Sequence, residues 1–252
     1  MATRIISKSQ QAYGAFNGGQ IIENKPIGFP REGGFVRPYS NLFYWARAEA
    51  VITSTIGLHP HQGFEILSFV LDGEIHHYDT KTDAWAPLHA GDVQIIRAGS
   101  GIQHAERMEK GGVMFQIWLD PDLSKTLSQP ASYSDYRSGD FPIVTEGDHQ
   151  VKTLIGEGSP LRLDTSPIEV KRHTFSGKIQ LQVRESEVLS LYLIEGSGNV
   201  DGQTLEQDDF VIVDDKNGVI EIEANSQCDL FAIRNPAELE YHTYAQRAGQ
   251  YA

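Results

Sequence analysis

The chain has 252 residues, of which 40% are apolar, so it can bury the core of one large β domain or of two small ones. Its net charge of -13 and the absence of a dense Lys/Arg cluster argue against direct binding to nucleic acid. No apolar run reaches the roughly 18 residues of a transmembrane helix, so no membrane partner is expected.

Two further features bear on the compartment. Cys228 is the single cysteine, which excludes an intrachain disulfide and is consistent with a reducing compartment. The N-terminal residues contain no apolar stretch typical of a secretory signal. We therefore expect a cytoplasmic location, or a nuclear one if the source is eukaryotic.

Short runs rich in β-branched and aromatic residues follow one another along the chain, and Gly, Asp or Asn bounds most of them. The runs predicted to be strands are 65–79, 92–99, 112–120, 190–200, 208–215, 218–224 and 228–234. The polar, turn-rich stretch 121–141 is predicted to connect two halves. The best candidate for a short helix is 236–247, where Pro236 suits a first helical position.

The two halves repeat one pattern. An apolar strand, an acidic residue with a glycine, a second strand, an acidic turn and another apolar strand occur around Gly73 and again around Gly196. This recurrence indicates an internal duplication of a small β unit. Many short, closely spaced strands are typical of barrels and sandwiches, so we predict an all-β protein of two tandem β-barrels. The first is expected over residues 1–130 and the second over residues 131–252.

Two pairs of residues in the first half are candidate metal ligands. His59 and His61 stand two apart around Pro60, and His104 and Glu106 also stand two apart. Because alternate residues of a strand face the same way, each pair can point at one place. Three imidazoles and a carboxylate suit a divalent metal such as Fe(II), Mn, Ni, Cu or Zn, and leave an octahedral ion two open positions. The alternative, two independent surface pairs, is less favoured because both pairs lie beside glycines in one predicted barrel.

A family resemblance rests on these same stretches. The sequences "HPHQGFEILSFVLDGEIHHYD" and "AGDVQIIRAGSGIQHAE" together closely resemble the signature of pirins, a branch of the cupin superfamily with two barrels in one chain. The resemblance is strong over about 57–121 and fair elsewhere, and it implies a bicupin fold. It also implies a metal, usually iron, held by His59, His61, His104 and Glu106. The ordinary cupin pattern places its glutamate soon after H-x-H, which makes Glu65 the second candidate.

Some positions depart from the pattern. Many pirins carry a basic residue where this chain has Gln62, and a neutral amide makes the rim of the site less positive. In the second repeat, the positions that match the four ligands by counting are Gln182, Arg184, Glu221 and Glu223. No metal is therefore expected in the second barrel.

The remaining histidines are expected to have structural roles. His76 and His77 are adjacent in a strand, so one of them is predicted to point inward as a partner of the site. His149, His173 and His242 have no companions in sequence and are predicted to lie on the surface.

The resemblance implies two functions from different classes. Some pirins show quercetin 2,3-dioxygenase-like activity, which implies a small aromatic flavonol and O2 as substrates here, with Glu106 as the general base. The alternative is an iron-dependent redox-sensing regulator that acts through a protein partner. A broad apolar pocket at the metal would favour the enzyme, and a flat charged rim would favour the regulator.

Overall fold

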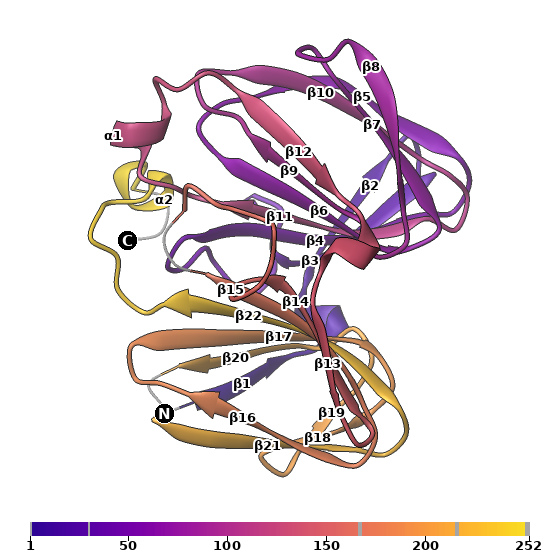
Figure 1. Cartoon of the computed structure of the whole chain (residues 1–252), viewed down its shortest axis with the longest axis vertical. Coiled ribbons are helices and arrows are strands. Elements are labelled where there is room, and N and C mark those ends of the chain that lie inside the picture. The colour runs from indigo at the N-terminus through magenta and orange to yellow at the C-terminus, as the bar shows by residue number, and fades with distance from the viewer. Residues whose placement is uncertain (1, 30, 166–167, 215–216, 250–252) are drawn as a thin grey trace. The chain divides into compact units, whose positions relative to one another are not determined.

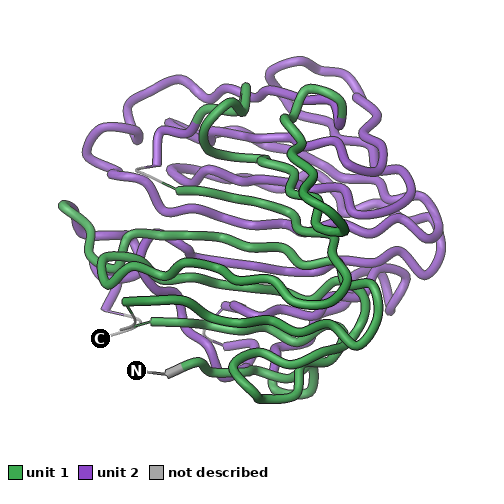
Figure 2. Tube along the Cα trace, turned by 60° about the horizontal axis from the view of Figure 1, so that its bottom comes forward, with its two compact units in different colours: residues 1–10, 139–162, 167–240 green, residues 11–138, 163–166, 241–252 purple. Residues whose placement is uncertain are grey.

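The protein is built almost wholly of β-strands. The computed structural model describes residues 2–29, 31–165, 168–214 and 217–249 (Figure 1). By its internal contacts the chain divides into unit 1 (residues 1–10, 139–162 and 167–240) and unit 2 (residues 11–138, 163–166 and 241–252), coloured separately in Figure 2. Each unit contains a seven-stranded and a four-stranded sheet. The predicted all-β fold of two tandem cupin barrels is confirmed.

Unit 2 carries the histidine motifs. Its larger sheet has the order β12-β9-β6-β11-β4-β3-β2 and its smaller sheet the order β5-β10-β7-β8. The strands of the larger sheet are β2 (Ala12–Phe16), β3 (Ile21–Ile27), β4 (Leu42–Ala50), β6 (Glu65–Asp72), β9 (Val93–Arg97), β11 (Val113–Leu119) and β12 (Ser132–Tyr136). Those of the smaller sheet are β5 (Ser54–His61), β7 (Glu74–Asp79), β8 (Ala84–His89) and β10 (Ile102–Met108).

Unit 1 repeats this arrangement, with the sheet orders β1-β20-β17-β22-β15-β14-β13 and β16-β21-β18-β19. The larger sheet contains β1 (Ala2–Ile6), β13 (Ile143–Glu146), β14 (His149–Ile155), β15 (Glu169–Phe175), β17 (Glu187–Glu195), β20 (Phe210–Asp214) and β22 (Cys228–Pro236). The smaller sheet contains β16 (Lys178–Val183), β18 (Gly198–Val200), β19 (Gln203–Leu205) and β21 (Gly218–Ala224). The matching orders agree with the internal duplication expected from the sequence. The predicted boundary between the two barrels, at residues 130 and 131, stays a prediction. Strand β1, from the N-terminal end of the chain, pairs with β20 of the second half.

The repeated acidic-glycine motif is the tight turn of each unit. Gly73, between β6 and β7, has φ 69°, and Gly196, between β17 and β18, has φ 98°. A Cβ at Gly73 would lie 2.9 Å from the Cα of Gly112, and one at Gly196 would lie 2.7 Å from the Sγ of Cys228. Both turns therefore need glycine for its backbone freedom and for space.

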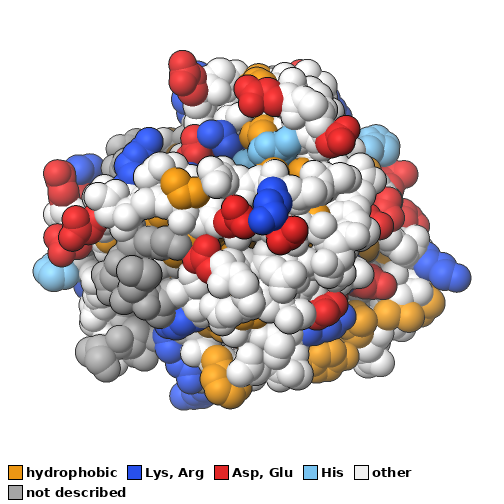
Figure 3. Space-filling model, turned by 90° about the horizontal axis from the view of Figure 1, so that it is seen from below, with side chains coloured by type: hydrophobic (Ala, Val, Ile, Leu, Met, Phe, Trp, Pro, Cys, Tyr) orange, Lys and Arg blue, Asp and Glu red, His pale blue; other side chains and the backbone are white. Residues whose placement is uncertain are grey.

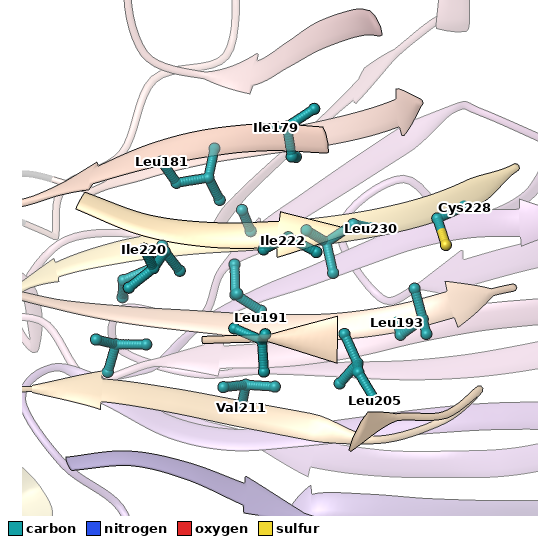
Figure 4. Packing of buried hydrophobic residues seen from close by; sticks show 14 of the residues in the cluster. Ile179, Leu181, Leu191, Leu193, Leu205, Val211, Ile220, Ile222, Cys228 and Leu230 are labelled. Carbon is teal, nitrogen blue, oxygen red and sulfur yellow. The ribbon is translucent and has the colours of Figure 1, made fainter. Parts of the chain in front are cut away.

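Aliphatic side chains fill the interior of unit 1. Leu181, Leu191, Ile220 and Leu230 belong to one buried cluster that draws on both sheets (Figure 4). Cys228 is 2% exposed within this cluster, as expected for a small buried hydrophobe.

The counted positions of the second repeat need a correction of register. Gln182 and Glu223 are exposed, and Arg184 lies beyond the end of β16 with an exposed side chain. The inward positions of β16 and β21 carry aliphatic residues such as Leu181 and Ile220. A shift of one residue moves a side chain to the opposite face of a strand. Strand β17 has 9 residues and β6 has 8, so counting back from Gly196 as from Gly73 chose the wrong face of β16.

The predicted helix 236–247 is largely wrong. Strand β22 runs on to Pro236, and the helix α2 covers Tyr244–Arg247 alone. Thr243 caps this helix, since its hydroxyl accepts from the backbone N–H of Gln246 and the Gln246 side chain accepts in return. The other helical turns are α1 (Leu123–Thr126), η1 (Lys8–Gln10) and η2 (Ser138–Asp140).

The prediction of surface positions is wrong for His173. Its side chain on β15 is 4% exposed, and its Nδ1 lies 3.0 Å from Nε2 of His149 on β14. The rings stack at 23° with their centroids 5.2 Å apart. Cross-strand pairing makes them neighbours although 24 positions separate them. Burial, followed by the proximity of His149, lowers the pKa of His173 to about 3.

The buried pair of His149 and His173 predicts that unit 1 loses stability in acid. The folded state disfavours protonated His173, so its stabilising contribution is complete above the ordinary pKa of 6.5 and is lost as the pH falls toward 3. We expect the free energy of unfolding to fall by up to about 1.4 kcal/mol per pH unit in this window. His173→Phe should flatten the slope measured by denaturant unfolding from pH 7.5 to 5, whereas His242→Phe, at an exposed position, should keep it. Equal slopes in all the proteins would contradict this role.

Two observations concern the predicted partner classes. No helix among the residues that the structure describes has the length and apolar character needed to span a membrane. On the face shown in Figure 3, acidic and basic side chains are interspersed.

Candidate metal centre

Three of the four predicted ligands meet on two paired strands. His59 and His61 lie on β5, His104 lies on β10, and the register sets His104 opposite His59. Each of the three histidines has a ring nitrogen that lies within 4.8 Å of a ring nitrogen of the other two. The ring centroids are 4.3 to 4.8 Å apart. The two-residue spacing in the sequence has the expected effect, because alternate residues on each strand face the barrel interior.

The nitrogen atoms of these histidines suit a metal. Nδ1 of His59 lies 2.8 Å from the carbonyl oxygen of Gly57, to which it can only donate, so the lone pair is on Nε2. Nε2 of His61 and both ring nitrogens of His104 are buried and have no hydrogen-bond partner among the described residues. Buried polar atoms nearly always have partners, and a bound cation would provide one here. The donor set therefore fits a divalent transition metal.

Electrostatics keep the imidazoles of His61 and His104 neutral. Burial, with the neighbouring His59, lowers the pKa of His61 to about 4. Burial and the surrounding histidines move the pKa of His104 far below its ordinary value. Neutral rings hold free lone pairs at pH 7, the form that a metal binds.

Glu106 follows His104 on β10 and is 4% exposed. A β-bulge in β10 lies between it and His104. The group of ligand atoms that lie within 4.8 Å of one another consists of the three histidines and does not include the Glu106 carboxylate. Its Oε1 accepts a 2.5 Å hydrogen bond from Nε2 of Gln116 on β11. Burial, followed by the charge of Glu23, raises the pKa of Glu106 to about 8. The structure thus places a carboxyl group that titrates near neutrality inside the same barrel.

Glu65, the second candidate, faces a different part of unit 2. Its Oε1 accepts the backbone N–H of Asp164 at 2.9 Å, and its Oε2 accepts both the backbone N–H of Thr165 at 2.7 Å and the Thr165 hydroxyl. Arg97 lies 3.6 Å away as an ion-pair partner. Glu65 is 1% exposed and both its carboxylate oxygens accept hydrogen bonds, so it fixes the backbone at Asp164 and Thr165.

Removing the hydroxyl of Thr165 tests this role. Thr165→Val keeps the shape but removes one donor from a buried carboxylate, so we expect unfolding to become easier by about 1–3 kcal/mol. Metal binding should not change. Thr145→Val, at an exposed position of β13, is the control in denaturant unfolding. No difference between the two variants would show that Glu65 does not hold this segment.

The expectation for the adjacent histidines is confirmed. His77 is 3% exposed, whereas the side chain of His76 is 25% exposed and pairs with Glu74. Nε2 of His77 lies 3.2 Å from Oδ2 of the buried Asp79, and its ring lies 5.4 Å from that of His104. His77 is therefore the inward residue of the pair and a neighbour of the histidine cluster.

An open depression of about 770 Å³ gives access to His61. It is lined by Pro60, His61, Gln62, Thr80, Ser100, Gly101, Ile102 and Gln103. Gln62, the departure from the family pattern, donates a 3.2 Å hydrogen bond to the carbonyl oxygen of Ser100. No charged side chain is among these lining residues, apart from a histidine that is neutral.

An aromatic wall stands beside His61, and its Trp118 was not predicted from the sequence. Trp118 on β11 packs edge-on at 4.7 Å from the His61 ring and 5.6 Å from Phe64. Phe43 and Phe64 lie 4.5 Å apart in the same cluster. This wall excludes water from one side of the histidines. The sequence contains one sign of a special role for this strand, because the polar Gln116 interrupts an otherwise apolar run two residues before Trp118.

Comparisons with known proteins agree with this picture. Residues 35–119 match the family model described as Pirin. Pirin-1 of Arabidopsis thaliana is 32% identical over 155 residues, which cover 57% of this chain and 52% of Pirin-1, so this chain spans about half the length of that relative. YhhW from Escherichia coli superposes with a TM-score of 0.77 at 20% identity, over 96% of this chain and 100% of YhhW. A quercetin 2,3-dioxygenase from Acinetobacter baumannii gives a TM-score of 0.70 at 23% identity, over 81% and 78% of the two chains.

Two barrel units in one chain, with a histidine cluster in one of them, define a bicupin. Within that class, the resemblance to pirins predicted from the H-P-H and G-I-x-H-x-E motifs is confirmed by the match of residues 35–119 to the Pirin family model and by the identity with Pirin-1.

Proposed function

We propose that the chain is a metal-dependent dioxygenase that acts on flavonol-type substrates with O2. The observation that carries the proposal is the pair of neutral imidazoles of His61 and His104, whose buried nitrogens have no partner among the described residues, inside the barrel that also buries Glu106. Fe(II) is the proposed metal, as the resemblance implies. Mn, Ni, Cu and Zn are the other metals that this set of ligands accepts. The relatives lend support: the bacterial pirin YhhW has a structure in complex with nickel(II), and a quercetin 2,3-dioxygenase shares the fold.

His59, His61 and His104 would hold the metal in this proposal, and Glu106 is the proposed fourth ligand or free base of the site. A bound divalent metal supplies the Lewis acidity that acidifies a substrate hydroxyl and the redox chemistry that O2 requires. Glu106 in its ionised form accepts the hydroxyl proton, for which a pKa of about 8 is well matched. Trp118 and its aromatic neighbours keep water from the reacting groups.

The depression around His61 is not the broad apolar pocket expected of the enzyme, but its lining has no charged side chain of the kind expected of the redox-sensing regulator. Its lining is neutral and offers amide, hydroxyl and backbone groups, which suit an uncharged polyhydroxylated aromatic ligand. A regulator that reports the charge of its metal would need charged groups near that metal.

Oxygen consumption tests the proposal. We expect the Fe(II)-loaded protein to consume O2 on addition of at least one member of a flavonol panel, and the His59→Ala/His104→Ala variant to consume none above background. Metal binding without any flavonol-dependent uptake would overturn the dioxygenase and support the regulator.

A further inference from the structure

The depression beside His61 is lined by residues that hydrogen-bond to one another. Nε2 of Gln62 lies 3.2 Å from the carbonyl oxygen of Ser100. The Thr80 hydroxyl donates to the carbonyl oxygen of Gln103 at 3.3 Å and accepts from the backbone N–H of Gln103 at 3.2 Å. Because each contact joins two lining residues, a ligand that enters meets polar groups that are already in position.

The contact with Ser100 fixes which way the Gln62 amide faces. A backbone carbonyl oxygen accepts hydrogen bonds and cannot donate them, so the NH2 group of Gln62 must face Ser100. The Gln62 side chain is exposed, and its Oε1 therefore remains as an acceptor for a ligand hydroxyl. This arrangement favours a hydroxyl over a carboxylate or sulfonate at this place, because an ionised oxygen has no proton to donate.

The cationic side chains that follow the lining residues in the chain are engaged elsewhere. Lys81 donates from its Nζ to the carbonyl oxygen of Ala131 at 2.6 Å. Arg107, further along β10, pairs with Glu109 at 2.8 Å. An anionic ligand would meet no positively charged side chain among the lining residues that the structure describes, and the net charge of -13 opposes its approach.

We propose that Gln62 is a specificity-determining residue, which selects an uncharged hydroxylated aromatic substrate over one that carries a carboxylate or sulfonate group. Its Oε1 accepts a hydroxyl of the favoured substrate. Its neutral amide also withholds the cation that an anionic substrate would need for pairing. This role rests on the proposed function, because it takes a flavonol-type substrate to bind in the depression beside His61.

Binding of two related compounds to the Fe(II)-loaded protein in the absence of O2 tests the proposal. The compounds are quercetin and quercetin with one added sulfonate group, and calorimetry measures both affinities. Gln62→Arg should raise the affinity for the sulfonated compound relative to quercetin by about tenfold or more, because the guanidinium pairs with the sulfonate. Gln62→Leu should weaken quercetin binding by about threefold to tenfold, the effect of one neutral hydrogen bond, with no gain for the sulfonated compound.

Two controls separate this selection from a general change in charge. Gln150→Arg adds the same charge at an exposed position of β14, and it should keep the wild-type ratio of the two affinities. Salt at about 1 M should remove most of the gain in Gln62→Arg, because it screens exposed charges, whereas the effect of a structural change would persist. The charge of the metal is the same in all the proteins, so it does not alter these comparisons.

The outcomes distinguish the role of Gln62 from the dioxygenase activity. An unchanged ratio of affinities in Gln62→Arg, or a wild type that binds both compounds equally well, would overturn the role and leave the dioxygenase standing. The expected ratios in a protein that consumes no O2 would support the role and overturn the dioxygenase. A wild type that binds neither compound would overturn both the role and the proposed substrate class.

Discussion

Glu106→Gln is expected to leave the fold intact and to lower turnover by about 100-fold or more. The amide has nearly the shape of the carboxyl group, but it cannot accept the proton of a substrate hydroxyl. Glu106 is wholly enclosed, and burial raises its pKa to about 8, so its protonated form is already compatible with the folded barrel. The measurement is the rate of O2 uptake under saturating flavonol, with circular dichroism as the check on folding.

Glu223→Gln provides the matched control for turnover. Glu223 is the residue that matched Glu106 by counting in the second repeat, and it is exposed beside Lys178. This variant should retain wild-type rates. Unchanged turnover in Glu106→Gln would remove the base assignment, whatever the metal content of the protein.

His104→Leu is expected to abolish metal binding and yet to stabilise the metal-free protein. Both ring nitrogens of His104 are buried with no partner among the described residues, and the side chain is 0% exposed. An unsatisfied buried polar group costs about 1–3 kcal/mol, so an apolar side chain of similar size should raise the free energy of unfolding by a comparable amount. The measurement is denaturant unfolding in the presence of a chelator, with nickel affinity determined separately.

His77→Leu separates this effect from a general tolerance of leucine. His77 is also buried, but its Nε2 bonds to Asp79, so its removal leaves a buried carboxylate with one partner fewer. We expect that variant to be destabilised. A loss of stability in His104→Leu as well would contradict this prediction. It would mean that the His104 nitrogens have a partner in the metal-free protein, so that the histidine does not lower the free energy of unfolding.

Strand periodicity made much of the metal site predictable. His59, His61 and His104 converge because residues two apart share a face and because β5 and β10 pair. The same rule places Glu106 inside the barrel, where it is 4% exposed, although β10 has a bulge between His104 and Glu106. A bulge leaves no clear mark in a single sequence. The family pattern named Glu106, but it did not reveal the contact with Gln116.

Residues distant in the sequence account for most of the other differences. Glu65 meets Thr165 across 100 positions, and His173 meets His149 through the pairing of β14 with β15. Neither contact follows from local pattern. The helix expected from Pro236 onward failed because the strand before it continues, which shows tertiary pairing outweighing a local start signal.

The most direct test of the account is the metal content of the purified protein after loading with Fe(II) and removal of free ions, compared with His59→Ala/His104→Ala. The histidine cluster predicts about one ion per chain in the wild type and essentially none in the variant. Equal metal content in the two proteins, or none in the wild type, would contradict a metal centre at these histidines.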